Sequence, residues 1–206
     1  MMVSTRAFLL ACLLVGCFQI TGLTVAPFAA EARDESVLDQ SSRQPGSTNR
    51  VILPTVSLVD QDNRAQRLDR LVEARTVVIG FVYTNCKTSC SILSAIMAQV
   101  EQRVRDRLGD HVVLVSLTVD PAHDTPAQLK AYAAKFAETP HWYWLTGSVA
   151  DVQQALRAFN IPTFGKPEDH APVIVAGNVR TGKWQRWIGI PDPDAVARAA
   201  QALSKE

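Results

Sequence analysis

Two cysteines, Cys86 and Cys90, lie four residues apart in the segment 80–90, GFVYTNCKTSC. The apolar run over 76–83 that precedes them indicates a buried strand, and the segment 91–107 that follows has helical spacing of apolar residues. Residues i and i+4 lie on one face of a helix, so both sulfurs can point the same way. Two thiols at such a strand-to-helix turn suit dithiol–disulfide exchange or the binding of a soft metal ion.

The surroundings of the pair favour copper among soft metals. A helix amino terminus stabilises a thiolate, and Lys87 adds a positive charge beside it. A closed zinc site uses four ligands, whereas Cu(I) accepts two or three. The folded part of the chain offers two cysteines and few histidines, which favours copper. Bound Cu(I) would displace thiol protons, so the affinity for copper should fall at low pH.

Four histidines are candidates for a third ligand. His111 and His141 are expected at the edge or surface of the domain. His123 lies in a loop on the carboxyl side of the predicted sheet, but it too is expected to play no part in the site. His170 follows a loop over 160–169 that is rich in Pro and Gly, and it closely precedes a predicted strand. An imidazole there can reach the cysteine turn, the alternative being a loop histidine that faces solvent.

Residues 1–32 are predicted to be an export signal or membrane anchor, because a positive flank, an apolar run and a cluster of small residues follow one another. Three versions stay open: cleavage near Ala30 or Ala32, an uncleaved anchor, and a lipoprotein with its lipid on Cys17, since 14–17 resemble a lipobox. All three export the domain, soluble or tethered to the membrane, to the bacterial periplasm.

Export affects the cysteine pair, because Cys86 and Cys90 can form a local disulfide bond in an oxidising compartment. A bridge that closes so short a loop adds little stability, so a purely structural role explains the pair poorly.

The 206 residues and the net charge of +1 suit one compact domain and give no basic excess for nucleic acid. Residues 33–50 are polar and are predicted to form a flexible tether. Residues 51–206 are predicted to fold as the copper-binding domain, which begins with a hairpin over 53–68.

Strands and helices then alternate, which indicates an α/β fold. Together with the cysteine turn, this favours a thioredoxin-like fold with an N-terminal β-hairpin extension and an extra hairpin near the C-terminus. The predicted strands are 76–83, 111–119, 142–145, 172–179 and 183–188, and the predicted helices are 91–107, 126–137, 149–159 and 193–203.

Two further groups of residues invite interpretation. Trp184 and Trp187 are three apart in a predicted strand and face opposite sides, so at most one is expected in the core, the other being available for docking. Asp120 is expected to turn the chain, and Asp124 and Thr125 to cap the helix that follows, so a catalytic role is not expected for them.

The combination of motifs resembles the Sco/SenC family of copper-binding cytochrome c oxidase assembly proteins. The resemblance covers about 53–203 and rests on the cysteine segment, on VSLTVDPAHDTP at 115–126, on WLTG at 144–147 and on Asp169-His170. It implies a thioredoxin-like fold that holds one copper ion through Cys86, Cys90 and His170. Many members have proline after each motif cysteine, where this chain has Lys87 and Ser91, so the surface presented to a partner differs.

Two functions are therefore predicted. The first is an exported metallochaperone that delivers copper to the binuclear copper centre of cytochrome c oxidase, with the copper-receiving subunit of the oxidase as its partner. The alternative is a thiol–disulfide oxidoreductase that reduces cysteines of that centre or of other exported proteins, in which Cys86 attacks and Cys90 resolves. A peroxide-reducing thiol enzyme is a weaker third interpretation, because nothing obvious activates one cysteine over the other.

Overall fold

The computed structural model describes residues 46–47, 51–86, 89–136, 139–163 and 165–205. The described residues all belong to one compact unit, which lies within Glu35–Glu206. The predicted export segment and most of the predicted tether lie outside the described residues. Within the tether range, Gly46–Ser47 form β1, which pairs with β8. No helix in the described part of the chain is long and apolar enough to cross a membrane.

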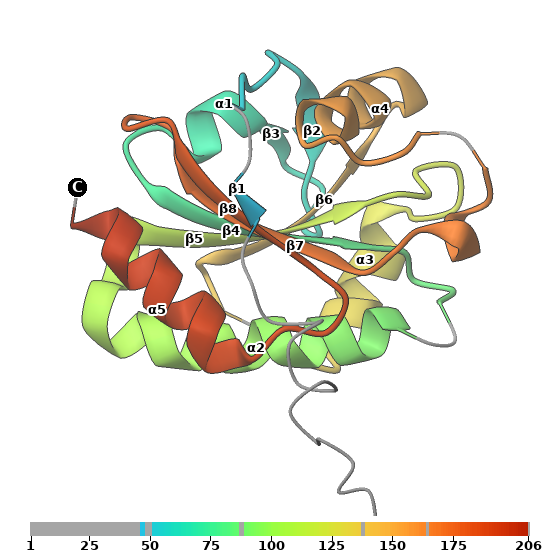
Figure 1. Cartoon of the computed structure of the whole chain (residues 1–206). Helices are drawn as coiled ribbons and strands as arrows, with labels where there is room; N and C mark the ends of the chain where they lie inside the picture. Colours follow the sequence, from blue (N-terminus) through green and yellow to red (C-terminus); the bar gives the residue numbers. More distant parts are fainter. Residues whose placement is uncertain (1–45, 48–50, 87–88, 137–138, 164, 206) are drawn as a thin grey trace, which may run out of the picture. The chain divides into compact units, whose positions relative to one another are not determined.

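One mixed sheet joins the described strands in the order β1-β8-β7-β4-β5-β6-β2-β3 (Figure 1). The neighbours β4, β5 and β6 are parallel, whereas β7 and β8 run antiparallel at one side and β2 and β3 at the other. The strands are β2 (Ser57–Val59), β3 (Ala65–Arg67), β4 (Thr76–Val82), β5 (Val112–Thr118), β6 (Trp142–Gly147), β7 (Val173–Asn178) and β8 (Lys183–Ile188).

The central strands have the composition that a doubly covered sheet requires. Every residue of β4 and β5 is buried, and both strands are rich in β-branched residues. Parallel strands are buried on both faces because their crossover helices cover the sheet, so they have continuous apolar runs and no alternation. The predicted α/β fold is therefore confirmed, together with the hairpin over 53–68 and the hairpin formed by β7 and β8.

Helices form a layer on each face of the sheet (Figure 1). Apolar residues of α2, α3 and α5 share one core cluster, and those of α1 and α4 share the other. The helices are α1 (Leu68–Leu71), α2 (Ser89–Leu108), α3 (Pro126–Ala133), α4 (Val149–Ala158) and α5 (Pro193–Ser204), with short 3₁₀ turns η2 (Gly109–His111) and η3 (Pro167–Asp169).

Helix ends follow the local chemistry of the sequence. Thr125 caps α3, because its hydroxyl accepts from Gln128 N at 3.3 Å while the Gln128 side chain accepts from Thr125 N. Ser148 caps α4 by accepting from Asp151 N at 3.1 Å. Gly109 follows α2 with φ of +48°, the left-handed conformation that ends many helices. These three predicted boundaries are confirmed.

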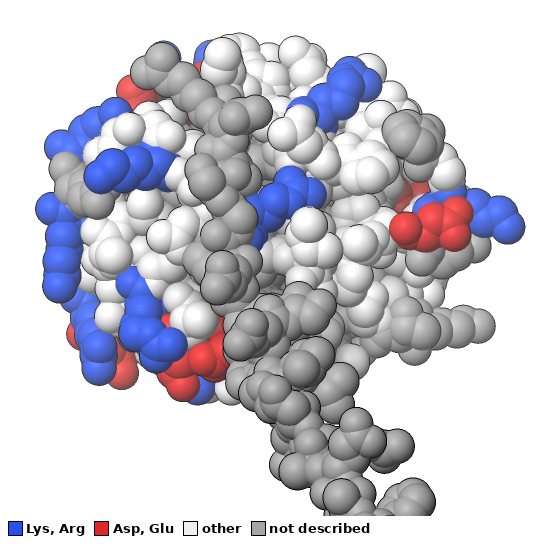
Figure 2. Space-filling view, viewed as in Figure 1, with Lys and Arg blue, Asp and Glu red and all other residues white. Residues whose placement is uncertain are grey.

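Polar contacts between side chains join α2 and α5. Arg103 pairs with Asp194 at the start of α5, and Arg107 donates to Gln201 near its end at 3.3 Å. The two helices therefore run side by side in the same direction. On the face in Figure 2, Lys and Arg side chains gather at the left edge, the side on which both helices end in Figure 1. Arg105 and Arg107 lie in the last turn of α2, where the helix dipole favours cations.

The burial of Trp184 and Trp187 differs from what was predicted. They face opposite sides of β8 as expected, but both are buried, with exposed fractions of 5% and 3%. Trp184 packs against Phe159 with ring centroids 5.6 Å apart, and Trp187 joins the core cluster of α2 and α5. The prediction that at most one is core was wrong because helices cover both faces of the sheet even at β8. Neither tryptophan is available for docking.

The sheet topology places the candidate site. Because β4 and β5 are parallel and β7 is antiparallel to β4, the carboxyl ends of β4 and β5 and the amino end of β7 meet at one edge of the sheet. Cys86 follows β4, Asp120 follows β5, and His170 precedes β7. Binding sites of open α/β sheets form at this carboxyl edge.

Candidate metal centre

The cysteine turn connects β4 to α2. It begins with a backbone bond from Cys86 N to the Tyr83 carbonyl at 3.3 Å, and α2 begins at Ser89. Cys90 thus lies in the first helical turn, where its N–H has no partner within the helix. That N–H donates to Cys86 Sγ at 3.2 Å. The helix terminus therefore directs a backbone dipole at the first sulfur, an orientation that stabilises negative charge on a thiolate.

Cys86 and Cys90 are not joined in a disulfide, and their surroundings differ. Cys86 is half-buried, whereas Cys90 is 7% exposed. Burial and a hydrogen bond with Cys86 raise the pKa of Cys90 to about 12. The expectation that the helix terminus lowers the thiol pKa therefore fails for Cys90, because desolvation outweighs the dipole. Cys86 is therefore the more accessible of the two cysteines. Lys87, expected to add a positive charge, lies outside the described residues.

His170 lies between η3 and β7, with its imidazole against the sheet. Its ring is tilted against Phe81 of β4, with centroids 6.3 Å apart. Burial first, and the positive charge of Arg186 second, hold the pKa of His170 below its usual value, so the ring is neutral at pH 7. Within the described part of the chain, its buried Nε2 has no hydrogen-bond partner. A neutral imidazole with an unpartnered nitrogen fits a metal ligand.

A cavity of about 240 Å³ borders His170 on the side of α4. Its wall also includes Asp120 after β5, Gln153 of α4 and Lys166 before η3. The cavity therefore lies between the loops that follow β5 and α4.

The three predicted ligands lie along one edge of the sheet, but they do not form a finished coordination sphere. Among the described residues, no group of three or more His, Cys, Asp or Glu side chains is spaced to hold a metal ion. The structure brings Cys86 and Cys90 together and places His170 at the same edge of the sheet. The set Cys86, Cys90 and His170 therefore stays a prediction.

The other three histidines were not predicted as ligands, and the structure gives each an ion partner or an exposed position. His123 Nδ1 lies 2.8 Å from Asp120 Oδ1, its side chain is 68% exposed, and the hydrogen bond to Asp120 raises its pKa. His141 lies 3.4 Å from Asp110 near the amino ends of the parallel strands. His111 is exposed at the end of η2.

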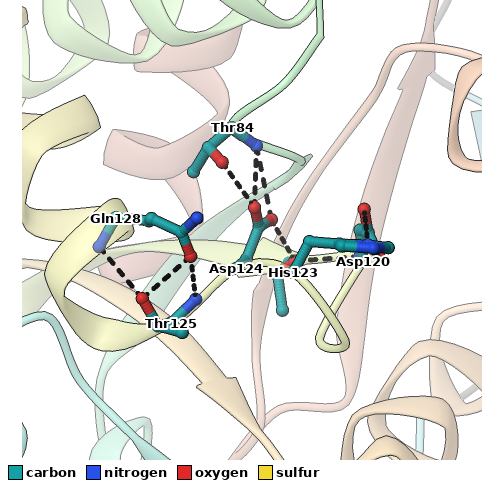
Figure 3. Close-up of polar contacts among 7 residues, drawn as sticks. Thr84, Asp120, His123, Asp124, Thr125 and Gln128 are labelled. Atoms are coloured by element: carbon teal, nitrogen blue, oxygen red, sulfur yellow. Dashed lines mark hydrogen bonds and ion pairs between the residues drawn. The ribbon is translucent and has the colours of Figure 1, made fainter.

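Asp124, in the loop after β5, has a different role from the one predicted from the sequence. Asp124 was expected to cap α3, but Thr125 is the cap, and Asp124 points back toward the cysteine turn (Figure 3). Its carboxylate accepts from Thr84 N at 3.1 Å, from Thr84 Oγ1 at 2.6 Å and from Thr118 Oγ1 at 2.5 Å. The sequence contained one signal of this contact. Thr84 follows one apolar strand and Thr118 ends the next, so both were expected at the edge where the carboxyl ends of the strands meet.

The mixed sheet, with a dithiol between β4 and α2 and a hairpin of β7 and β8, defines a thioredoxin-like dithiol domain. The model of the family described as SCO1/SenC matches residues 46–176, and the chain belongs to this family. The SCO1 protein homolog of Bacillus subtilis is 32% identical over 118 residues, 56% of this chain and 60% of that protein. A candidate copper-binding protein of Stutzerimonas stutzeri is 28% identical over 110 residues, 53% and 52% of the two chains.

Two solved structures extend the comparison. A SCO1/SenC family lipoprotein from Bacillus anthracis is 26% identical, with a TM-score of 0.66, and the match covers 78% of this chain and 98% of that one. BsSco is 25% identical, with a TM-score of 0.63 and coverage of 81% and 99%. It is described as a member of the Sco family of cytochrome c oxidase assembly proteins with a disulfide switch. The chain spans little more than half the length of the curated relatives it matches.

Proposed function

We propose that this chain is an exported copper metallochaperone that delivers copper to the binuclear copper centre of cytochrome c oxidase during assembly. The observation that carries the proposal is the juxtaposition of Cys86 and Cys90, with the Cys90 N–H directed at Cys86 Sγ. Family membership supports it, as do a copper-binding description among the relatives and the oxidase-assembly description of BsSco.

The proposed ligands differ in what each contributes. Cys86 and Cys90 supply two soft thiolates, which suit Cu(I), and His170 supplies a neutral imidazole nitrogen. Cys90 keeps its proton in the metal-free chain and releases it when copper binds, because a coordinated thiol is deprotonated. Copper affinity should therefore fall at low pH.

The proposed delivery is a stepwise exchange of ligands. Cys86 is the more exposed sulfur, so a thiolate of the copper-receiving subunit bonds to the ion as the Cys86 bond to it breaks. Cys90 and His170 follow, and Cu(I) leaves without any change in oxidation state. The receiving subunit must therefore approach the edge of the sheet where the cysteine turn lies.

Localisation is part of the proposal. Residues 1–32 serve as an export signal or anchor, with lipid attachment at Cys17 as one version, and 33–50 tether the domain of 51–206 to the membrane side. The lipoprotein relative from Bacillus anthracis supports export with membrane tethering. The domain would then act in the periplasm.

A second function, thiol–disulfide exchange, is favoured by the asymmetry of the two thiols. The Cys86 thiolate would attack a partner disulfide, form a mixed disulfide and release one partner thiolate. Cys90 would then attack Cys86 Sγ, release the second partner thiol and leave a Cys86–Cys90 disulfide, so that two electrons pass to the partner. This sequence does not use His170.

Replacing His170 with alanine distinguishes the two functions. We expect His170→Ala to lower the Cu(I) affinity of the reduced full chain by at least about tenfold, since even the loss of outer partners of a metal site costs 10- to 100-fold. Its rate of disulfide exchange should stay close to wild type. The affinity is measured by competition with a Cu(I) chelator.

His123→Ala is the matched control, because His123 is exposed and paired with Asp120. It should leave the Cu(I) affinity unchanged. Equal affinities of wild type, His170→Ala and His123→Ala would show that His170 is not a ligand.

A further inference from the structure

Asp124 is a buried carboxylate that is paired with no cation among the residues that the structure describes. It is 1% exposed, and no ion pair among the described residues involves it. A charge removed from water in this way must be satisfied by hydrogen bonds. Asp124 obtains them from residues outside its own loop, which indicates a task beyond shaping that loop.

The donors come from the ends of two adjacent strands, β4 and β5. Thr84 lies between β4 and the cysteine turn and donates both its N–H and its hydroxyl to the carboxylate. Thr118 ends β5 and donates its hydroxyl from the neighbouring strand. Asp124 N in turn donates to the Asp120 carbonyl at 2.9 Å, which holds the carboxylate in place. The carboxylate therefore joins the cysteine turn to the loop after β5.

Thr84 is two residues from Cys86, and the turn between them is short. The carbonyl of Tyr83, the residue before Thr84, accepts from Cys86 N. Fixing both donors of Thr84 therefore fixes where the turn directs Cys86 Sγ. Without Asp124, the Thr84 N–H and hydroxyl would lose their acceptor at the point where the chain leaves the sheet.

We propose that Asp124 is a positioning residue for the dithiol: by clamping Thr84, it holds Cys86 Sγ close to Cys90. A positioned pair has a high effective concentration of one sulfur relative to the other. Such positioning favours the intramolecular disulfide over mixed disulfides with small thiols, and it favours chelation of one metal ion by both sulfurs. The copper consequence rests on the proposed function, whereas the disulfide consequence does not.

The test measures the equilibrium between the dithiol and the disulfide in glutathione buffers, well below the unfolding temperature. The full chain carries Cys12→Ser and Cys17→Ser, so that Cys86 and Cys90 are its only thiols. We expect Asp124→Ala to reduce the equilibrium constant for disulfide formation at least tenfold, equivalent to about 30 mV. Asp124→Asn keeps an oxygen for the Thr84 N–H and should stay within about threefold of wild type.

Asp60 provides a matched control. It is also buried, at 2% exposed, and accepts from Asp62 N, Arg64 N and Gln66 Nε2 at 2.8–2.9 Å in the turn between β2 and β3. The strands β5 and β6 separate β2 from β4. Asp60→Ala should lower thermal stability yet leave the disulfide equilibrium unchanged. If Asp124→Ala shifted that equilibrium no more than Asp60→Ala does, the positioning role would be refuted.

A second pair of variants covers the case in which Asp124→Ala does not fold. Thr84→Val removes only the hydroxyl donor and should shift the equilibrium in the same direction as Asp124→Ala. Thr84→Ser keeps a hydroxyl donor and should stay close to wild type. Equal equilibria for Thr84→Val and Thr84→Ser would overturn the proposal. Cu(I) affinity is measured on the same variants. A wild-type chain that binds no copper would refute the proposed function, while the glutathione equilibrium would still decide the role of Asp124.

Discussion

Replacement of Cys86 with serine is expected to lower the Cu(I) affinity of the reduced chain by more than about a hundredfold. A serine hydroxyl is a hard, protonated donor at pH 7, whereas Cu(I) prefers soft thiolates. Loss of a direct ligand should exceed the 10- to 100-fold cost of removing an outer partner. Cys90→Ser should have an effect of similar size, because both sulfurs are needed to chelate the ion. Competition with a Cu(I) chelator under strictly reducing conditions measures both.

The control for this prediction lies in the same chain. Cys12→Ser and Cys17→Ser remove the two thiols of the predicted export segment and should leave the affinity unchanged. A loss of affinity in that double variant equal to the loss in Cys86→Ser would place copper at the N-terminal cysteines and contradict the proposed centre.

Substitution of Gly177 with alanine is expected to destabilise the fold by about 3 kcal/mol. Gly177 of β7 lies directly opposite Trp184 of β8, and a Cβ built on Gly177 overlaps the indole ring. The indole cannot move away easily, because it is buried against Phe159. The protein must therefore shift two strands or expel the tryptophan. Chemical denaturation measures the change in the free energy of unfolding.

Gly80 offers a matched comparison in the neighbouring strand β4. A Cβ added there would lie 3.4 Å from Met97 Cγ, an ordinary contact with a flexible side chain. Gly80→Ala should therefore change the free energy of unfolding by no more than about 1 kcal/mol. Equal losses for Gly80→Ala and Gly177→Ala would show that the Trp184 contact does not restrict position 177.

Much of the fold could be predicted because its signals are local. The buried runs of β4 and β5 are continuous and β-branched, and Thr125 and Ser148 cap helices by contacts within three residues. Such patterns depend on spacing along the chain, which the sequence contains in full. The burial of both Trp184 and Trp187 depends instead on helices from distant segments of the chain that pack on the two faces of β8. Strand periodicity alone therefore gave the wrong prediction that at most one of them is in the core.

For the candidate site, too, some features could be predicted from the sequence and others could not. The cysteine pair follows from a four-residue spacing at a strand-to-helix turn, and the structure brings those sulfurs together. The raised pKa of Cys90 arises from burial, which spacing does not reveal. The contact of Asp124 with Thr84 spans 40 residues and required the pairing of β4 with β5. The role of His170 as a ligand depends on how its loop meets the cysteine turn, and it stays a prediction.

The most direct test of copper delivery is transfer from the copper-loaded full chain to the purified copper-binding domain of an oxidase subunit, with its cysteines reduced. After the two proteins are separated, their copper contents are measured. The account predicts that copper moves to the oxidase domain from the wild-type chain, and that Cys86→Ser, which loads poorly, transfers little. Copper that stayed on the wild-type chain would contradict delivery. If copper stayed there and the metal-free chain reduced a disulfide in a separately oxidised sample of that domain, thiol–disulfide exchange would be the function instead.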